Sequence, residues 1–326
     1  MTAAERLVRR ASERGVTTLT LDSPHNRNAL SVRLVQELYD ALDAAAKDPE
    51  IRAVVLTHTG GTFCAGADLG EATAAAPPAA PAPGSAGSGP AASGPAASED
   101  TTPQSPSQSP ASQSQASQSP ASHSSASQSP TGEAAPGGPK SPGGSGASAP
   151  LGLARLLRTI VELPKPVVAR VTGHVRAGGL GLLGACDIAV AGPGASFAFT
   201  EARLGLAPAV ISMPLLPRLD PRAASRYYLT GERFDAVEAA RIGLVTVAAG
   251  SDREVDEALA PVLDGLRRAS PQGLAESKRL VTAEVLRGFD RDTDALAEQS
   301  ARLFASDEAR EGMTAFLERR DPAWAR

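Results

Sequence analysis

The sequence predicts a single α/β domain that is interrupted by a long segment of different composition. Short apolar strands alternate with helices of 3.6-residue periodicity on both sides of the interruption. Two of the strands lead into glycine-rich turns that open into helices, and the pattern is helical from Asp252 to the end. We therefore expect a core at residues 1–71 and 151–251, an insertion at 72–150, and a helical region at 252–326.

Composition and charge exclude several classes of function. The 326-residue chain has a net charge of −4 and only 3% aromatic residues, which argues against nucleic acid as a partner. No apolar run reaches the ~20 residues that a membrane span needs, and the N-terminus lacks an apolar stretch of signal-peptide length. We therefore expect a soluble, cytoplasmic protein. The histidines are scattered without metal-ligand spacing, so no metal is expected, and Cys64 and Cys186 are expected to be buried thiols.

The first elements are a hairpin, a helix and a buried strand. Residues 7–21 predict a β-hairpin with a polar turn at residues 12–15. Ser31 predicts the N-cap of a helix whose apolar positions recur at helical spacing until Asp48-Pro49 ends it. Residues 51–57 are mostly apolar, which is typical of a strand in a sheet that is covered on both faces.

The insertion at residues 72–150 contains no leucine, isoleucine, valine, methionine or aromatic residue. Such a segment cannot bury enough apolar area to offset the entropy of ordering, so we expect it to be disordered. The tetrapeptide Ser-Gln-Ser-Pro recurs there from Ser107, Ser117 and Ser127. This repeat contains no core residue, which excludes a solenoid.

Structure is expected to resume at Leu151. Residues 151–161 present one apolar helical face, and residues 167–171 form a strand that leads to a glycine turn. An apolar helix follows at 180–185, and residues 188–190 and 196–199 are strand-like.

Three apolar stripes mark the C-terminal helices. They consist of Val255, Leu259, Val262, Leu263 and Leu266, then Leu274, Leu280, Val281 and Val285, then Leu303, Phe304, Met313, Phe316 and Leu317. Helices with this much apolar surface pack against a core or against a neighbouring subunit.

Two glycine-rich turns carry the candidate chemistry. Residues 63–69 and residues 177–181 each follow a predicted strand. Glycine lets the backbone approach a ligand closely, and the free N–H groups of a helix's first turn point toward whatever lies in front of them. The N–H groups of Ala67 and Gly178 are therefore two candidate donors for one oxyanion hole.

These turns occur among other motifs in a characteristic order. The motifs are Phe-Cys-Ala-Gly-Ala-Asp-Leu at 63–69, Pro-Lys-Pro-Val-Val-Ala-Arg-Val-Thr-Gly at 164–173, Gly178-Gly179, Ala-Cys-Asp-Ile at 185–188, and Glu-Ala-Arg-Leu-Gly-Leu at 201–206. Together they resemble the crotonase, or enoyl-CoA hydratase/isomerase, family, from about Val16 to the C-terminus. The resemblance implies a layered spiral of ββα units with a helical C-terminal region, assembled as a homotrimer or hexamer. It also implies an acyl-CoA thioester as substrate and no cofactor beyond the coenzyme A of that substrate.

The resemblance further implies roles for single residues. The thioester oxygen would lie between the N–H groups of Ala67 and Gly178, where an enolate is stabilised. Glu201 matches one of the two glutamates of the family's hydratases, whereas the second would fall at Gly181, where this sequence has no carboxylate. Hydration is the family's commonest activity. Double-bond isomerisation fits this sequence better on physical grounds, because one carboxylate can take a proton at one carbon and return it at another.

Contacts to coenzyme A also follow from the resemblance. The segments that line the coenzyme A channel match Arg27, Ala29, Ala65, Asp68 and Leu69. Phe316 and Arg319 match an aromatic and a basic residue that reach the nucleotide, often that of a neighbouring subunit. An ordinary surface charge explains Arg319 equally well.

A function of another class stays open at this point. The missing carboxylate at Gly181 favours a non-catalytic acyl-CoA-binding or scaffold protein, with the insertion as its interaction arm. Glu201 and the two glycine turns oppose it. Taken singly, each turn is also compatible with a tight corner of an α/β fold, and Glu201 with a solvated residue at a helix N-terminus.

Overall fold

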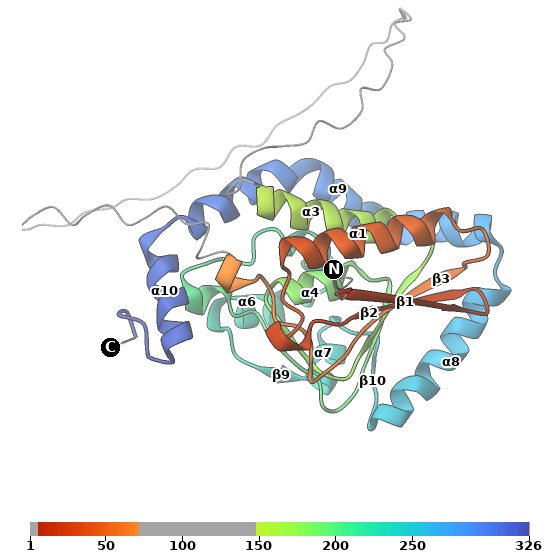
Figure 1. The fold of residues 1–326 in the computed structure, drawn as a ribbon, viewed down its shortest axis with the longest axis horizontal. Helices are drawn as coiled ribbons and strands as arrows, with labels where there is room; N and C mark the ends of the chain where they lie inside the picture. Colours follow the sequence, from red (N-terminus) through yellow and green to blue (C-terminus); the bar gives the residue numbers. More distant parts are fainter. Residues whose placement is uncertain (1–5, 72–147, 326) are drawn as a thin grey trace, which may run out of the picture. The chain divides into compact units, whose positions relative to one another are not determined.

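The computed structural model describes residues 6–71 and 148–325, which fall in one compact unit (Figure 1). The insertion predicted at 72–150 lies outside the described residues, except that residues 148–150 already belong to a helix. In the described part, the larger sheet contains, in spatial order, β1 (Val8–Glu13), β2 (Val16–Leu21), β3 (Ala53–His58), β5 (Val167–Val171), β7 (Ile188–Ala191) and β10 (Val247–Ala248). The smaller sheet contains β4 (Thr62–Cys64), β6 (His174–Arg176), β8 (Ser196–Ala198) and β9 (Phe234–Asp235). The pairs β1–β2 and β8–β9 are antiparallel, and the other pairs are parallel.

The helices alternate with these strands along the chain. They are α1 (Val32–Lys47), α3 (Ser148–Glu162), α4 (Gly178–Ala185), α5 (Ser212–Leu215), α6 (Pro221–Thr230), α7 (Ala236–Arg241), α8 (Asp252–Arg268), α9 (Pro271–Phe304) and α10 (Asp307–Glu318). The described residues also contain two short 3₁₀ helices, η1 (Pro24–Asn26) and η2 (Glu201–Leu204). Each predicted strand and helix therefore has its counterpart among the described residues.

The hairpin turn is shorter than predicted. Ser12 and Glu13 pair in register with Thr17 and Val16, so they belong to the strand. Only Arg14 and Gly15 remain in the turn, and both have positive φ (49° and 75°), as two-residue hairpin turns of type I′ require.

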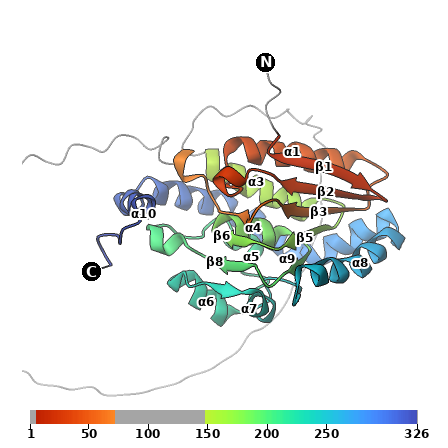
Figure 2. The same ribbon diagram turned by 60° about the horizontal axis from the view of Figure 1, so that its bottom comes forward.

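The larger sheet is covered on both faces, as its apolar strands indicate. Val54, Leu56 and Val167 belong to the main core, to which α1 and α3 also contribute. Val55 and Val168 point the other way, because side chains alternate along a strand, and pack with Val255 and Leu259 of α8. In Figures 1 and 2, α1, α3 and α9 lie together along one face, and α8 lies across the other.

Helix α1 shows how local sequence fixes an element. The Ser31 hydroxyl accepts a hydrogen bond from the Leu34 N–H at 3.2 Å, which confirms the predicted N-cap. The helix ends at Lys47, just before Asp48-Pro49. Its buried residues are Leu34, Leu38, Leu42 and Ala45.

The stripe predicted on α9 was wrong in part. Leu280 and Val281 are 79% and 77% exposed. The neighbouring face is buried instead, because it carries Lys278, whose Nζ forms an ion pair with Asp187 at 2.7 Å and donates to the Ile160 carbonyl at 2.8 Å. The buried face of α9 thus includes a charged residue with a partner from a distant segment, which apolar spacing alone does not indicate.

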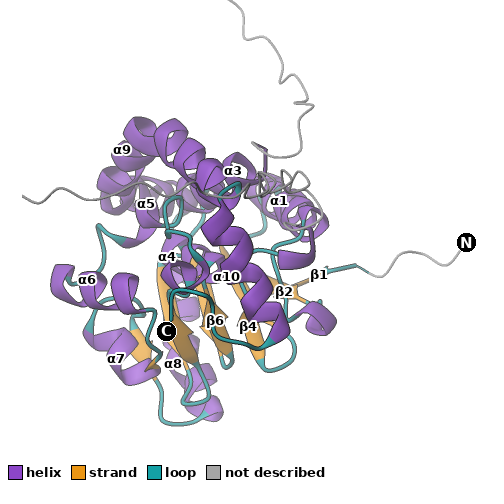
Figure 3. Ribbon diagram, turned by 90° about the vertical axis from the view of Figure 1, so that its left-hand side faces the viewer, coloured by secondary structure: helices purple, strands orange, loops and turns teal. Residues whose placement is uncertain are grey.

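Helix α10 packs closely on η2 through two glycines. A Cβ atom at Gly205 would lie 2.6 Å from the Glu308 carbonyl carbon, and one at Gly312 would lie 2.6 Å from the Leu204 carbonyl carbon. Larger residues at these positions would push the two segments apart. Figure 3 shows α10 together with the smaller sheet from this side.

Candidate functional site

The smaller sheet brings the predicted site residues to one edge. Strands β4, β6 and β8 are adjacent and parallel. The turn at residues 65–67 follows β4, the turn at 177–178 follows β6, and Glu201 follows β8 after two residues. In α/β folds with parallel strands, ligands bind at the carboxyl ends of the strands. The topology therefore gathers the three groups that the sequence singled out.

The two glycine turns are in direct contact. A Cβ atom at Gly66 would lie 2.8 Å from the Ala177 Cβ and 3.2 Å from the Gly178 nitrogen. Gly66 also has φ of +92°, a conformation that residues with a side chain rarely adopt. The Leu30 N–H donates to the Gly66 carbonyl at 2.8 Å, which fixes this turn against the loop before α1. Glycine at position 66 thus lets the Ala67 segment approach Gly178.

The two candidate oxyanion donors are not used by the loops and turns of the described chain. Gly178 is the first residue of α4, so its N–H has no acceptor within its own helix. In the part of the chain that the structure describes, neither this N–H nor that of Ala67 donates to a loop or turn carbonyl. Ala177 holds a strained conformation with φ of 45° and ψ of −122°, and its N–H donates to the Ala198 carbonyl at 3.2 Å. The strained residue thereby links the turn to β8.

Glu201 is a buried carboxyl group. The residue is 8% exposed, and its Oε2 atom has no hydrogen-bond partner among the described residues. Burial raises the pKa of this carboxyl to about 7. The Thr200 side chain precedes η2 but makes no capping hydrogen bond to it. Glu201 is therefore present in both protonation states near neutral pH, which suits a group that takes and returns a proton.

Gly181 lies where a second hydratase glutamate was expected, and packing explains why no side chain is present. A Cβ atom there would lie 2.5 Å from the Ile211 Cγ2 and 3.1 Å from the Leu157 Cδ1. All residues of α4 are buried. A glutamate at position 181 would have to displace Ile211, so the absence of this carboxylate is part of how α4 packs.

The coenzyme A candidates of the N-terminal half lie beside the turn at residues 65–67. The Arg27 carbonyl accepts from the Ala65 N–H at 3.1 Å, and the Asp68 Oδ2 accepts from the Asn26 side chain at 3.1 Å. The Arg27 side chain is exposed, and Ala29 is buried. One backbone and one side-chain hydrogen bond thus hold the two segments together and leave the arginine accessible.

The C-terminal candidates are placed differently. Leu69 packs with Leu206 and Met313, so α10 reaches the segment that follows the turn at residues 65–67. Phe316 is 57% exposed, and Arg319 is exposed at the end of α10 with φ of 57°. A single chain therefore does not bury these two side chains against the turn.

Asn28 supports the candidate site, although no sequence motif gives it a role of its own. Its side chain is buried, accepts from the Ser23 N–H at 2.7 Å, and donates to the carbonyls of Thr59 and Thr62 at 3.2 and 2.7 Å. These bonds fasten the Arg27 loop to the segment between β3 and β4. Asn28 has a positive φ of 54°, which asparagine adopts more readily than most residues. An asparagine in this loop is therefore the sequence feature that could have indicated such a position.

The cysteines have no catalytic features. Both are free and buried, as predicted, and burial raises the pKa of each thiol to about 12. Thiols with such pKa values stay protonated and unreactive at neutral pH. The close approach of Gly179, whose Cβ would lie 2.7 Å from the Cys64 Cβ, shows that Cys64 is a packing residue.

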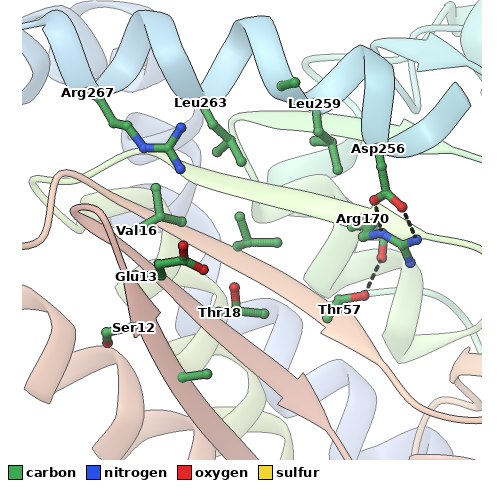
Figure 4. Close-up of a pocket in the computed structure, with 13 residues that line it drawn as sticks. Ser12, Glu13, Val16, Thr18, Thr57, Arg170, Asp256, Leu259, Leu263 and Arg267 are labelled. Carbon is green, nitrogen blue, oxygen red and sulfur yellow. Dashed lines mark hydrogen bonds and ion pairs between the residues drawn. The ribbon is translucent and has the colours of Figure 1, made fainter. Parts of the chain in front are cut away.

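A separate cavity lies between the larger sheet and α8. It has a volume of about 610 Å³, and Figure 4 shows the ion pair between Arg170 and Asp256 (2.6 Å) at one end and Glu13 and Arg267 toward the other. None of the predicted site residues lines it. It is therefore distinct from the candidate site at the smaller sheet.

The described residues contain neither a metal-binding cluster nor a membrane-spanning helix. Within residues 6–71 and 148–325, no group of three or more histidine, cysteine, aspartate and glutamate side chains is arranged to hold a metal ion. None of the helices in these ranges is both long enough and apolar enough to cross a membrane.

Comparison with known proteins agrees with this geometry. The model of the enoyl-CoA hydratase/isomerase family matches residues 11–84 and 144–326. An enoyl-CoA hydratase of Mycobacterium tuberculosis is 29% identical over 323 residues, which cover 95% of this chain and 93% of that protein. The crystal structure of an enoyl-CoA hydratase from Mycobacterium avium is similar with a TM-score of 0.72 and 45% identity, and covers 98% of this chain and 100% of that one. Carnitinyl-CoA dehydratases, such as that of Citrobacter koseri, are 34% identical over 173 residues, which span 52% of this chain and 66% of theirs.

The family match covers both described segments of the core, and the solved relatives share the arrangement of its sheets and helices. The expected crotonase-like fold is therefore confirmed. The chain belongs to the enoyl-CoA hydratase/isomerase family.

Proposed function

We propose that this acyl-CoA enzyme moves the double bond of an enoyl-CoA, with Glu201 as the proton carrier. The observation that supports this most strongly is the buried Glu201 carboxyl, with an unpartnered Oε2 and a pKa raised to about 7 by burial. It lies at the same sheet edge as the N–H groups of Ala67 and Gly178, which we assign as the oxyanion hole.

The reaction follows from these groups. With a 3-enoyl-CoA, the Glu201 carboxylate takes a proton from C2, and the electron pair of that C–H bond moves to the thioester oxygen to give a dienolate. The two N–H groups stabilise this negative charge, and loss of one such donor raises the barrier by about 3–4 kcal/mol. Glu201 then returns the proton to C4 as the electrons move back, which leaves a conjugated 2-enoyl-CoA. One carboxylate suffices for both proton transfers.

Hydration of a 2-enoyl-CoA is the second candidate, because the solved and curated relatives are named enoyl-CoA hydratases. Water addition needs a group that holds the water in addition to one that takes its proton. Position 181 cannot supply that group, because Ile211 occupies the space. A hydratase with this site would need another partner for the water.

The remaining assignments follow the family. Arg27, Ala29, Ala65, Asp68 and Leu69 would line the coenzyme A channel. Phe316 and Arg319 are exposed at the end of α10, which suits contacts to the nucleotide of a neighbouring subunit in a homotrimer or hexamer. We assign residues 1–71 and 151–251 to the acyl-CoA-binding core and 252–326 to the region that covers coenzyme A and mediates assembly. A cytoplasmic location is proposed on the same basis.

Incubation with 3-hexenoyl-CoA and with crotonyl-CoA tests this proposal. We expect the ultraviolet absorbance of the conjugated thioester to rise with 3-hexenoyl-CoA, because isomerisation creates the conjugated product. Binding of both thioesters without any product would favour the non-catalytic acyl-CoA-binding alternative instead.

A further inference from the structure

Two buried oxygen atoms near the candidate site lack hydrogen-bond partners among the described residues. One is the Glu201 Oε2, and the other is the hydroxyl of Tyr228. Buried polar atoms in native proteins are almost always paired with protein, water or ligand. Two unpaired atoms of complementary chemistry, a hydroxyl donor and a carboxyl acceptor, therefore indicate a position for a third polar atom.

The elements that carry Tyr228 and Glu201 pack against each other. The Tyr228 ring packs on the Phe199 ring with a centroid distance of 4.4 Å, and Phe199 precedes Glu201 by two residues. The Arg203 Nε in η2 donates to the Thr230 carbonyl in α6 at 2.9 Å. A Cβ atom at Gly231 would lie only 3.0 Å from the Phe199 carbonyl oxygen. Helix α6 is thus fixed against the segment that carries Glu201.

The charges of the two groups suit this arrangement. Burial, and in addition the neighbouring Glu201 carboxylate, raise the pKa of the Tyr228 phenol. Tyr228 therefore remains a hydrogen-bond donor throughout the neutral range. Glu201, with its pKa near 7, serves as the acceptor and as the proton carrier.

The adjacent tyrosine provides an internal contrast. The Tyr227 hydroxyl donates to the Glu238 Oε1 at 2.7 Å, so its hydrogen bond is complete within the protein. Its ring also packs in the core, 4.2 Å from that of Phe234. Only the second tyrosine of this pair keeps an unpaired hydroxyl.

We propose that the hydroxyl of Tyr228 and the carboxyl of Glu201 together hold the oxygen atom that is added to C3 of a 2-enoyl-CoA. This oxygen is the water in the forward reaction and the hydroxyl of the 3-hydroxyacyl-CoA in the reverse one. The inference rests on the proposed role of Glu201, and it gives the protein the water-holding group that Gly181 does not provide.

Glu201 and Tyr228 are sufficient for the addition of water to C3. Glu201 takes a proton from the water, the water oxygen forms a bond to C3, and the electron pair of the C2=C3 bond moves to the thioester oxygen as an enolate. C2 then receives the proton from Glu201 as the enolate collapses. Tyr228 donates a hydrogen bond to the oxygen throughout and keeps its own proton, which its pKa ensures.

The test compares Tyr228→Phe with Tyr227→Phe. For Tyr228→Phe we expect hydration of crotonyl-CoA to fall by about tenfold or more relative to isomerisation of 3-hexenoyl-CoA, because only hydration uses the oxygen. Tyr227→Phe loses a structural hydrogen bond, and the ratio of the two activities should stay unchanged. A general packing defect would lower both activities together. An unchanged ratio in Tyr228→Phe, or a wild-type enzyme that isomerises but does not hydrate, would overturn the inference.

A binding measurement separates this inference from the proposed function. By calorimetry, the wild-type protein should bind 3-hydroxybutyryl-CoA about five- to tenfold more tightly than butyryl-CoA, as one buried hydrogen bond allows. Tyr228→Phe should lose this preference while still binding both thioesters. If Tyr228→Phe keeps the wild-type preference for 3-hydroxybutyryl-CoA over butyryl-CoA, the role of Tyr228 is contradicted even if Glu201 proves catalytic. Loss of the preference in a protein without turnover would instead retain the oxygen-binding role and reject the catalytic one.

Discussion

The variant Glu201→Gln is expected to isomerise 3-enoyl-CoA at least about 100-fold more slowly than the wild-type protein. A glutamine has the size of the glutamate but cannot take the proton from C2, and a general acid–base group contributes about 10²–10⁴-fold. The rate of formation of the conjugated thioester at saturating substrate is the measurement. Since the barrier rather than the binding is affected, the affinity for a saturated acyl-CoA should change little.

A matched control is Glu232→Gln. Glu232 lies two residues after the end of α6 and pairs with Arg226 at 2.6 Å. Solvent-accessible ion pairs of this kind contribute little to stability. This variant should keep the wild-type rate. Melting curves should show both variants folded, because an amide avoids the cost of ionising a buried carboxyl. Full activity in a folded Glu201→Gln protein would show that another residue carries the proton.

The second large effect is expected at Gly178. Proline there removes the N–H that we assign to the oxyanion hole, and loss of one such donor lowers kcat by about 10²–10³-fold. Proline is well tolerated at the first position of a helix, where Gly178 lies. The expected result is a fall in kcat for isomerisation with a helical circular dichroism spectrum like that of the wild type.

Gly178→Ala is the control for this substitution, because it adds a side chain but keeps the N–H. Its Cβ would lie 3.0 Å from the Leu30 Cδ1, the far end of a side chain that can move. We expect a smaller loss than for proline, by at least about tenfold. Equal losses in both variants would show that bulk, rather than the missing donor, causes the effect.

Much of the fold could be predicted because local signals agreed with the global structure. Ser31 and the apolar spacing of α1 fixed both its start and its buried face. The failures have tertiary causes. Leu280 and Val281 are exposed, whereas the buried face of α9 carries Lys278, which pairs with Asp187. A contact between distant segments leaves no trace in local periodicity.

Some features of the candidate site could likewise be predicted from the sequence, and others depend on tertiary contacts. The glycine turns and Glu201 were predictable, because they lie in contiguous motifs. The buried state of Glu201 and the packing of Gly181 against Ile211 depend on segments that fold over them. No sequence motif pointed to Tyr228. Its proposed role rests on its unpartnered hydroxyl near Glu201, which only the folded structure reveals.

The most direct test of the account is the pH dependence of kcat/KM for isomerisation of 3-hexenoyl-CoA between pH 5 and pH 9. Glu201 must be ionised to take the proton from C2, and burial raises its pKa from the ordinary 4.5 to about 7. We therefore expect kcat/KM to increase about tenfold per pH unit at the acidic end and to level off above about pH 7. A midpoint near 4.5, or a rate that does not change across this range, would contradict the assignment of the buried Glu201 carboxyl as the catalytic base.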